Sequence, residues 1–154
     1  MLTASYPNSA EQVPLLPGSL LWRKDLKLNA VDHYRALLQS WPPLVAHINK
    51  SVDGYLEPRV ESFEAFAAGR EVKAEPAPSP IPIDEMWSRV QEIARARRPF
   101  GLMAFGEAWN CESFARYVRQ GIAHSVQATS AKEALAILGV VAGVVVLIAL
   151  VAEA

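Results

Sequence analysis

The residue best suited to nucleophilic chemistry is Cys111, the single cysteine of this 154-residue chain. Asn110, directly before it, is a favoured N-cap residue, and Glu112, directly after it, suits the positive end of a helix dipole. We therefore expect Cys111 to open a helix, where the dipole and the unpaired backbone N–H groups stabilise a thiolate. The alternative is a small buried hydrophobic side chain, since free cysteines are often buried.

The segment that follows Cys111 has the spacing of an amphipathic helix. Phe114, Ala115, Val118 and Ile122 recur at intervals of three and four residues. This spacing places the four side chains on one face of a helix. We expect that face to pack on the rest of the domain and so to hold the thiol in place.

Two histidines upstream of the cysteine could supply acid–base chemistry. His33 falls in a predicted strand over residues 31–38, and His47 falls in a predicted strand over residues 44–48. They are 14 residues apart with Ser40 at the midpoint, so an antiparallel hairpin about that point would set them directly opposite each other. Opposed residues share a face, with Cβ atoms roughly 5 Å apart. The alternative is two ordinary structural histidines.

The remaining elements must position these three side chains. The periodicity and the turn residues predict an antiparallel sheet packed on helices, which is an α+β arrangement. The expected elements are a strand over 19–23, an edge strand over 55–60, a helix over 63–68 capped by Ser62, a strand over 70–74, a proline-spaced linker over 75–82 and a helix from Asp84 to about Arg98.

The composition excludes several classes of protein. Hydrophobic residues make up 51% of the chain, and the formal net charge of −1 lacks the basic excess of a nucleic-acid-binding protein. A single cysteine excludes an intramolecular disulfide and is typical of a reducing compartment. The histidines and the cysteine lack zinc-site spacing, and there is no phosphate-binding glycine loop. We therefore expect no metal, no cofactor and no nucleic-acid partner.

The C-terminal end of the chain has the character of a membrane span. Residues 134–152 contain no charged or strongly polar side chain, and a helix of these 19 residues is roughly 28 Å long, about the hydrocarbon thickness of a bilayer. We expect a transmembrane helix, with a buried central helix as the alternative. Basic residues precede the stretch and only an acid follows it, which places the domain on the cytosolic face. Gly139 and Gly143 form a small-xxx-small pair that would support a homodimer.

Four short motifs and the apolar C-terminal stretch occur together in a recognisable order. The motifs are Pro17-Gly18-Ser19-Leu20, Asp32-His33-Tyr34, Val45-Ala46-His47 and Asn110-Cys111-Glu112-Ser113-Phe114. This order resembles the LRAT-like family, which includes lecithin:retinol acyltransferase and related phospholipase/acyltransferases. The family belongs to the papain-like NlpC-type cysteine hydrolases, in a permuted order in which histidine precedes cysteine. The resemblance covers roughly residues 14–127.

The resemblance implies a fold and a set of residue roles. It implies a permuted papain-like domain over 14–127, after an irregular lead over 1–13 and before the membrane span over 134–152. It implies Cys111 as nucleophile, His33 as general base and His47 as the residue that orients His33. The backbone N–H of Cys111, at the helix start, would then donate to the oxyanion.

The sequence departs from the family pattern in three places. Ser113 stands where the family usually has histidine, a position outside the triad. The two histidines are usually 12 residues apart and here are 14 apart. Residues 39–43 replace a glycine-rich hairpin, which changes the rim of the site and the expected choice of substrate.

The expected function is that of a membrane-anchored thiol acyltransferase or phospholipase. The resemblance implies that an acyl chain passes from a glycerophospholipid to Cys111 as a thioester, and then to water, an amine or a lysolipid. One alternative uses the same residues to cleave an amide, as a cysteine peptidase or amidase. Another is a non-catalytic, membrane-anchored interaction module.

Overall fold

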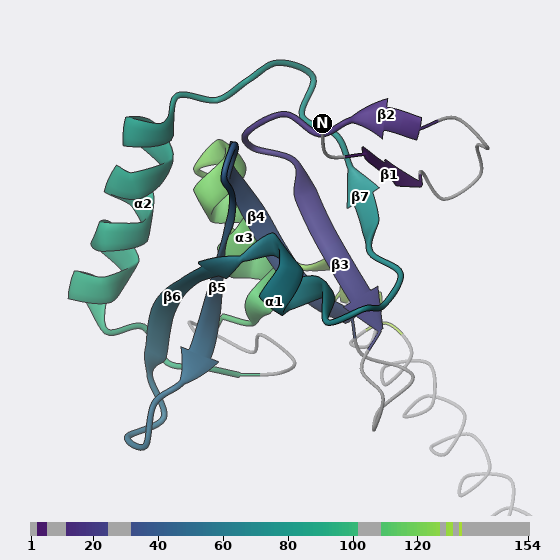
Figure 1. Ribbon diagram of the computed structural model, residues 1–154. Coiled ribbons are helices and arrows are strands. Elements are labelled where there is room, and N and C mark those ends of the chain that lie inside the picture. Colours follow the sequence, from purple (N-terminus) through teal and green to yellow (C-terminus); the bar gives the residue numbers. More distant parts are fainter. Residues whose placement is uncertain are drawn as a thin grey trace, which may run out of the picture.

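The computed structural model describes residues 3–5, 12–24, 32–101, 109–126, 129, 130 and 133. In this part of the chain the strands form one seven-stranded sheet in the order β2-β1-β7-β3-β4-β5-β6 (Figure 1). From β7 to β6 each pair of adjacent strands is antiparallel, whereas β1 pairs with β7 in parallel. The strands are β1 (Thr3–Ser5), β2 (Gln12–Pro14), β3 (Leu20–Lys24), β4 (Asp32–Ser40), β5 (Pro43–Lys50), β6 (Leu56–Ser62) and β7 (Lys73–Glu75).

In the described part of the chain three named helices accompany the sheet, and residues at their ends follow the usual preferences of helix termini. In α1 (Phe63–Ala67) the side chain of Ser62 accepts a hydrogen bond from the N–H of Ala65, as an N-cap residue does. The longest is α2 (Ile83–Ala96), which carries two acidic residues in its first turn and one basic residue in its last. The third is α3 (Cys111–Gln120), which ends at Gly121 in the left-handed conformation.

The sheet has a hydrophobic core on each face. On one face α2 and α3 pack on the even-numbered residues of β4 and β5, such as Leu38 and Ala46 (Figure 1). On the other face Phe66 of α1 packs on odd-numbered residues such as Leu37 and Val45. Since β4 and β5 are buried on both faces, their central residues read as continuous apolar runs rather than as an alternation.

The predicted α+β class, with an antiparallel sheet packed on helices, is confirmed, but several bounds differ. The lead over 1–13 was expected to be irregular, yet Thr3–Ser5 and Gln12–Pro14 form strands that extend the sheet. Asp84 lies inside α2, because the N-cap is Pro82. Ile122 is 62% exposed and outside α3, because the αL conformation of Gly121 ends the helix before a further turn forms.

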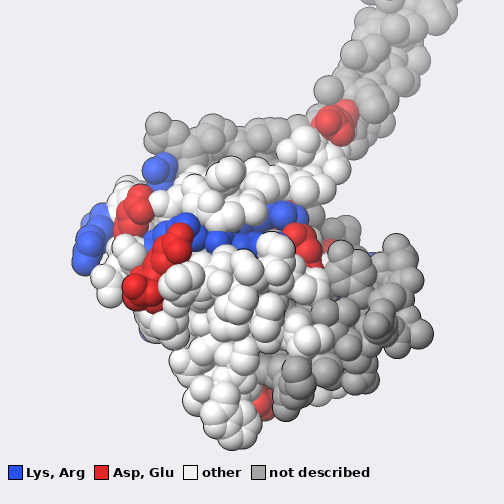
Figure 2. Space-filling model, turned by 90° about the horizontal axis from the view of Figure 1, so that it is seen from above, with Lys and Arg blue, Asp and Glu red and all other residues white. Residues whose placement is uncertain are grey.

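The predicted membrane span over 134–152, with Gly139 and Gly143, lies outside the described residues. Within the described part of the chain, none of the helices has the length and apolar character required to cross a bilayer. Seen from above, Lys and Arg side chains lie across this face with Asp and Glu side chains among them (Figure 2). This face therefore carries charges of both signs rather than a basic patch.

Candidate functional site

The start of α3 is built as the sequence predicts. The side-chain oxygen of Asn110 accepts hydrogen bonds from the N–H of Ser113 at 2.9 Å and from its hydroxyl at 3.1 Å. Asn110 is therefore a true N-cap, and Ser113 strengthens the cap with a second bond. Phe114, Ala115 and Val118 are fully buried, which fixes the helix on the sheet. Cys111 is the first residue of the helix, as expected.

Glu112 has a larger role than its expected contact with the helix dipole. Its side chain is completely buried, accepts a hydrogen bond from Arg116 Nε at 3.0 Å and accepts another from the Ser125 hydroxyl at 2.7 Å. The side-chain amide of Asn110 in turn donates to the Ser125 oxygen at 2.9 Å. This network ties the segment that follows α3 back to its first turn, directly beside Cys111. In the sequence only the i,i+4 spacing of Glu112 and Arg116 points to it.

The two histidines do not stand directly opposite each other. Ala36 of β4 pairs with Ala46 of β5, so the next residue along each strand sets Arg35 opposite His47. His33 lies two residues further along β4, beyond the last paired residues Ala36 and Ala46. The predicted direct opposition is therefore wrong, because it assumed a turn centred on Ser40 whereas the turn lies one to two residues later.

A β-bulge nevertheless keeps both histidines on one face of the sheet. Ser40 pairs with Pro43 across the turn, and that register alone would set His33 opposite an even-numbered residue of β5, on the face away from His47. The register shifts by one residue between Leu37 and Gln39, and this shift restores the match in parity. Because side chains alternate along each strand, His33 and His47 then share the face that α1 covers.

His47 is held by charged neighbours on that face. Its Nε2 atom lies 3.6 Å from Glu61 Oε1, and the same oxygen accepts a hydrogen bond from Arg35 Nε at 3.0 Å. Arg35 in turn stacks over the ring of Phe66. Burial lowers the pKa of His47, the positive charge of Arg35 lowers it further, and Glu61 opposes both. His47 is therefore a neutral imidazole near pH 7, and its side chain contacts Glu61.

The sulfur of Cys111 lies at the point where β4 and β5 separate. Leu37 exchanges backbone hydrogen bonds with Gly18 and Ser19, just before β3, so the even-numbered residues of β4 direct their backbone groups toward β5. The thiol donates to the carbonyl of Asp32 at 3.5 Å, and the N–H of Tyr34 donates to the sulfur. The sulfur thus contacts the backbone on both sides of His33, at the edge of β4 that faces β5.

One cavity brings Cys111 and His33 together. It has a volume of about 200 Å³ and opens between the end of β5 and the start of β4. Its lining residues are His33, Arg35, Ile48, Asn49, Lys50, Phe100 and Cys111. His47 does not line it. The structure therefore places two of the three predicted site residues on a common cavity.

The protonation state of Cys111 differs from the expectation of a stabilised thiolate. Burial raises the pKa of the thiol, and this effect exceeds the opposing hydrogen bonds from the N–H groups of Tyr34 and Glu112 and the nearby charge of Arg35. The helix start does lower the pKa, as predicted, but it does not offset desolvation. The resting side chain is a neutral thiol, so any nucleophilic step requires a base.

The first turn of α3 offers hydrogen-bond donors next to the sulfur. The N–H of Ser113 is bound by the N-cap side chain, and the N–H of Phe114 is bound by the carbonyl of Asn110. The N–H of Cys111 has no backbone acceptor within the helix, because it belongs to the first turn, whereas the N–H of Glu112 donates to the Cys111 sulfur. Among the described residues no group of three or more His, Cys, Asp or Glu side chains is placed to hold a metal ion.

Comparison with known proteins adds no relative to this chain. No protein-family model matches it, and neither a curated protein nor a solved structure matches it.

Proposed function

We propose that the chain is a membrane-anchored thiol acyltransferase or phospholipase of the LRAT-like type, with a permuted papain-like fold. The observation that carries this proposal is the common cavity of Cys111 and His33, with the sulfur held against the backbone on both sides of His33. A nucleophile and a base in one cavity, at the start of a helix, are the parts that thiol acyl transfer requires.

The chemistry follows from the neutral thiol. His33 accepts the thiol proton as the sulfur attacks the ester carbonyl, so general-base catalysis replaces a resting thiolate–imidazolium pair. The backbone N–H of Cys111 donates to the oxyanion that forms. Protonated His33 then returns the proton to the leaving alcohol, and the acyl group stays on Cys111 as a thioester. Water completes a phospholipase reaction, whereas an amine or lysolipid completes an acyl transfer.

His47 acts differently in this proposal from the role that the resemblance implies. It shares a face with His33 but contacts Glu61, and Glu61 also binds Arg35. We assign to the His47–Glu61–Arg35 cluster the task of fixing the β5 wall beside His33. The acyl donor is a glycerophospholipid, which the span over 134–152 would bring into reach by holding the domain at the cytosolic face of a membrane.

Mass spectrometry of the intact protein after incubation with phospholipid vesicles tests the proposal. We expect an added acyl mass on the wild-type chain and none on Cys111→Ser. His33→Gln should slow acylation by roughly a hundredfold or more, which is the usual contribution of a general base. His124→Gln, a change of the exposed third histidine, is the matched control and should leave the rate unchanged. Equal rates for the two histidine variants would refute the role of His33.

A second candidate, a non-catalytic interaction module, is favoured by the raised pKa of the buried Cys111 thiol. The two proposals differ in one measurement. If Cys111→Ser and the wild-type chain show the same mass before and after exposure to phospholipid, the thiol is structural and the second candidate stands.

A further inference from the structure

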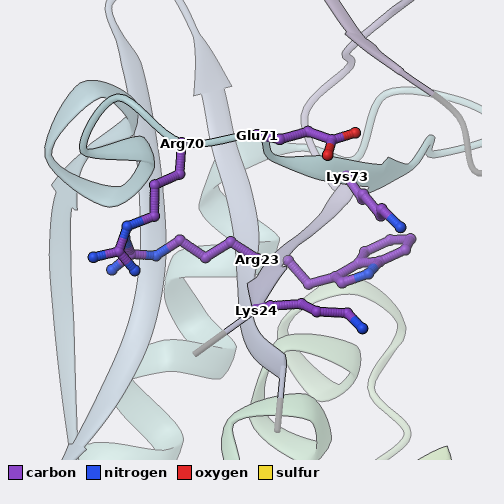
Figure 3. A pocket seen from close by; sticks show the side chains of 6 residues that line it. Arg23, Lys24, Arg70, Glu71 and Lys73 are labelled. Atoms are coloured by element: carbon purple, nitrogen blue, oxygen red, sulfur yellow. The ribbon is translucent and has the colours of Figure 1, made fainter. Parts of the chain in front are cut away.

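A second cavity, away from Cys111, is lined mainly by basic side chains. It has a volume of about 300 Å³. It lies where β3 ends and β7 begins, and its lining residues are Trp22, Arg23, Lys24, Arg70, Glu71 and Lys73. In Figure 3 the side chains of Arg23 and Arg70 extend to one side of the cavity and those of Lys24 and Lys73 to the other.

The charge of this cavity contrasts with that of the whole chain. Among the described residues, four cations and one carboxylate line it, although the formal net charge of the chain is −1. Several basic side chains elsewhere are paired with acids, as where Arg116 and Arg119 both pair with Glu75. Within the described residues, no carboxylate lies within ion-pair distance of Arg23, Arg70 or Lys73. The cavity therefore holds an excess of positive charge that an anion would neutralise.

Arg23 supplies the second, independent observation. Its Nε and Nη1 atoms are buried and have no hydrogen-bond partner in the described part of the chain. Its guanidinium lies over the ring of Phe66, 5.3 Å from the centroid, which fixes its plane. Buried donors of a charged group are costly to leave unpaired. A planar guanidinium held in this way is suited to bidentate contact with phosphate oxygens.

The cavity is adjacent to His33, the proposed base. Arg23 pairs directly with His33 across β3 and β4, so the two side chains share a face with Cβ atoms roughly 5 Å apart. The antiparallel order also brings the end of β3, the start of β4, the end of β5 and the start of β7 to the same end of the sheet. The basic cavity and the cavity of Cys111 therefore lie at the same end of the sheet.

We propose that this basic cavity binds a phosphate group and, in the reaction, the phosphate of the glycerophospholipid headgroup. The identification of the ligand as a lipid rests on the proposed function, whereas the phosphate site rests on the cavity itself. In a glycerophospholipid the phosphate and the acyl ester are separated by the glycerol unit alone. A phosphate bound by Arg23 and Arg70 would therefore hold the ester near His33 and Cys111 and select lipids with a charged headgroup over neutral glycerides.

Binding can be measured without turnover by using the full chain with Cys111→Ser. Calorimetric titration would use dihexanoylphosphatidylcholine, dihexanoylglycerol, sn-glycerol 3-phosphate and inorganic phosphate as probes. We expect the phosphate-bearing lipid to bind, and Arg23→Gln or Arg70→Gln to weaken it about tenfold, as loss of a charge-assisted contact does. If Arg23→Gln fails to fold, weakened binding of the same lipid is measured in Lys73→Gln instead. Arg95→Gln, a change of an exposed arginine on α2, is the matched control and should bind like the parent.

The outcomes separate this inference from the proposed function. Binding of phosphatidylcholine that is equal in Arg70→Gln, Lys73→Gln and Arg95→Gln would overturn the phosphate site. Glycerol 3-phosphate or inorganic phosphate bound as tightly as phosphatidylcholine would overturn the lipid assignment and leave a site for free phosphate. Phosphate-dependent binding together with no acylation of the wild-type Cys111 would support the site and refute only the enzymatic proposal.

Discussion

The buried charge beside the thiol gives the sharpest test of how this site is held together. In Glu112→Gln the shape of the side chain is kept but its negative charge is lost. Glu112 is completely buried, and the side chain of Arg116, its 3.0 Å partner, is 13% exposed. Removing one member of a buried ion pair costs about 3–5 kcal/mol, because the other charge stays buried without its partner. Arg116 retains Glu75 at 3.8 Å, so we expect about 3 kcal/mol, the low end of that range.

Chemical unfolding of the full chain, followed by circular dichroism, measures this loss. The matched control is Glu57→Gln, the same chemical change in an ion pair with Arg59 whose side chains are 44% and 54% exposed. Exposed pairs contribute about 0–1 kcal/mol, so this variant should unfold almost like the wild type. Equal free energies of unfolding for the two variants would refute the argument, since they would show that Arg116 does not need the charge of Glu112 in the fold.

Three further predictions concern the same site. Asn110→Ala removes the N-cap of α3 and should lower the free energy of unfolding by about 1 kcal/mol, whereas Asn49→Ala on β5 should not. Burial lowers the pKa of His47, so the contribution of His47 to the free energy of unfolding is complete above about pH 6.5 and is lost as the pH falls through the lower folded pKa. In His47→Gln the free energy of unfolding should therefore fall less steeply as the pH is lowered. Burial raises the pKa of Cys111, so the contribution of Cys111 to the free energy of unfolding is complete below about pH 8.5 and is lost as the pH rises through the folded pKa. A thiol-labelling rate whose half-maximal pH lies below that of free cysteine would contradict this.

The local features of the site could be predicted from the sequence, because they depend on neighbouring residues. The cap type of Asn110, the spacing of Phe114, Ala115 and Val118, and the capping of α1 by Ser62 are all properties of a few consecutive side chains, and all are confirmed. The strands around His33 and His47 were predicted for the same reason. The roles of these residues in acyl transfer stay predictions, because only an activity measurement tests them.

The tertiary structure decided how these local pieces meet. Sequence spacing alone set His33 opposite His47, but the bulge near Leu37 and the position of the turn moved the pairing by two residues. Local dipole reasoning predicted a stabilised thiolate, but burial between β4 and α3 made a neutral thiol. The basic cavity joins residues from β3 with residues near β7, and their proximity follows from the pairing of distant strands. Register, burial and charge clustering depend on contacts between segments far apart in the chain, so they cannot be predicted from capping and periodicity.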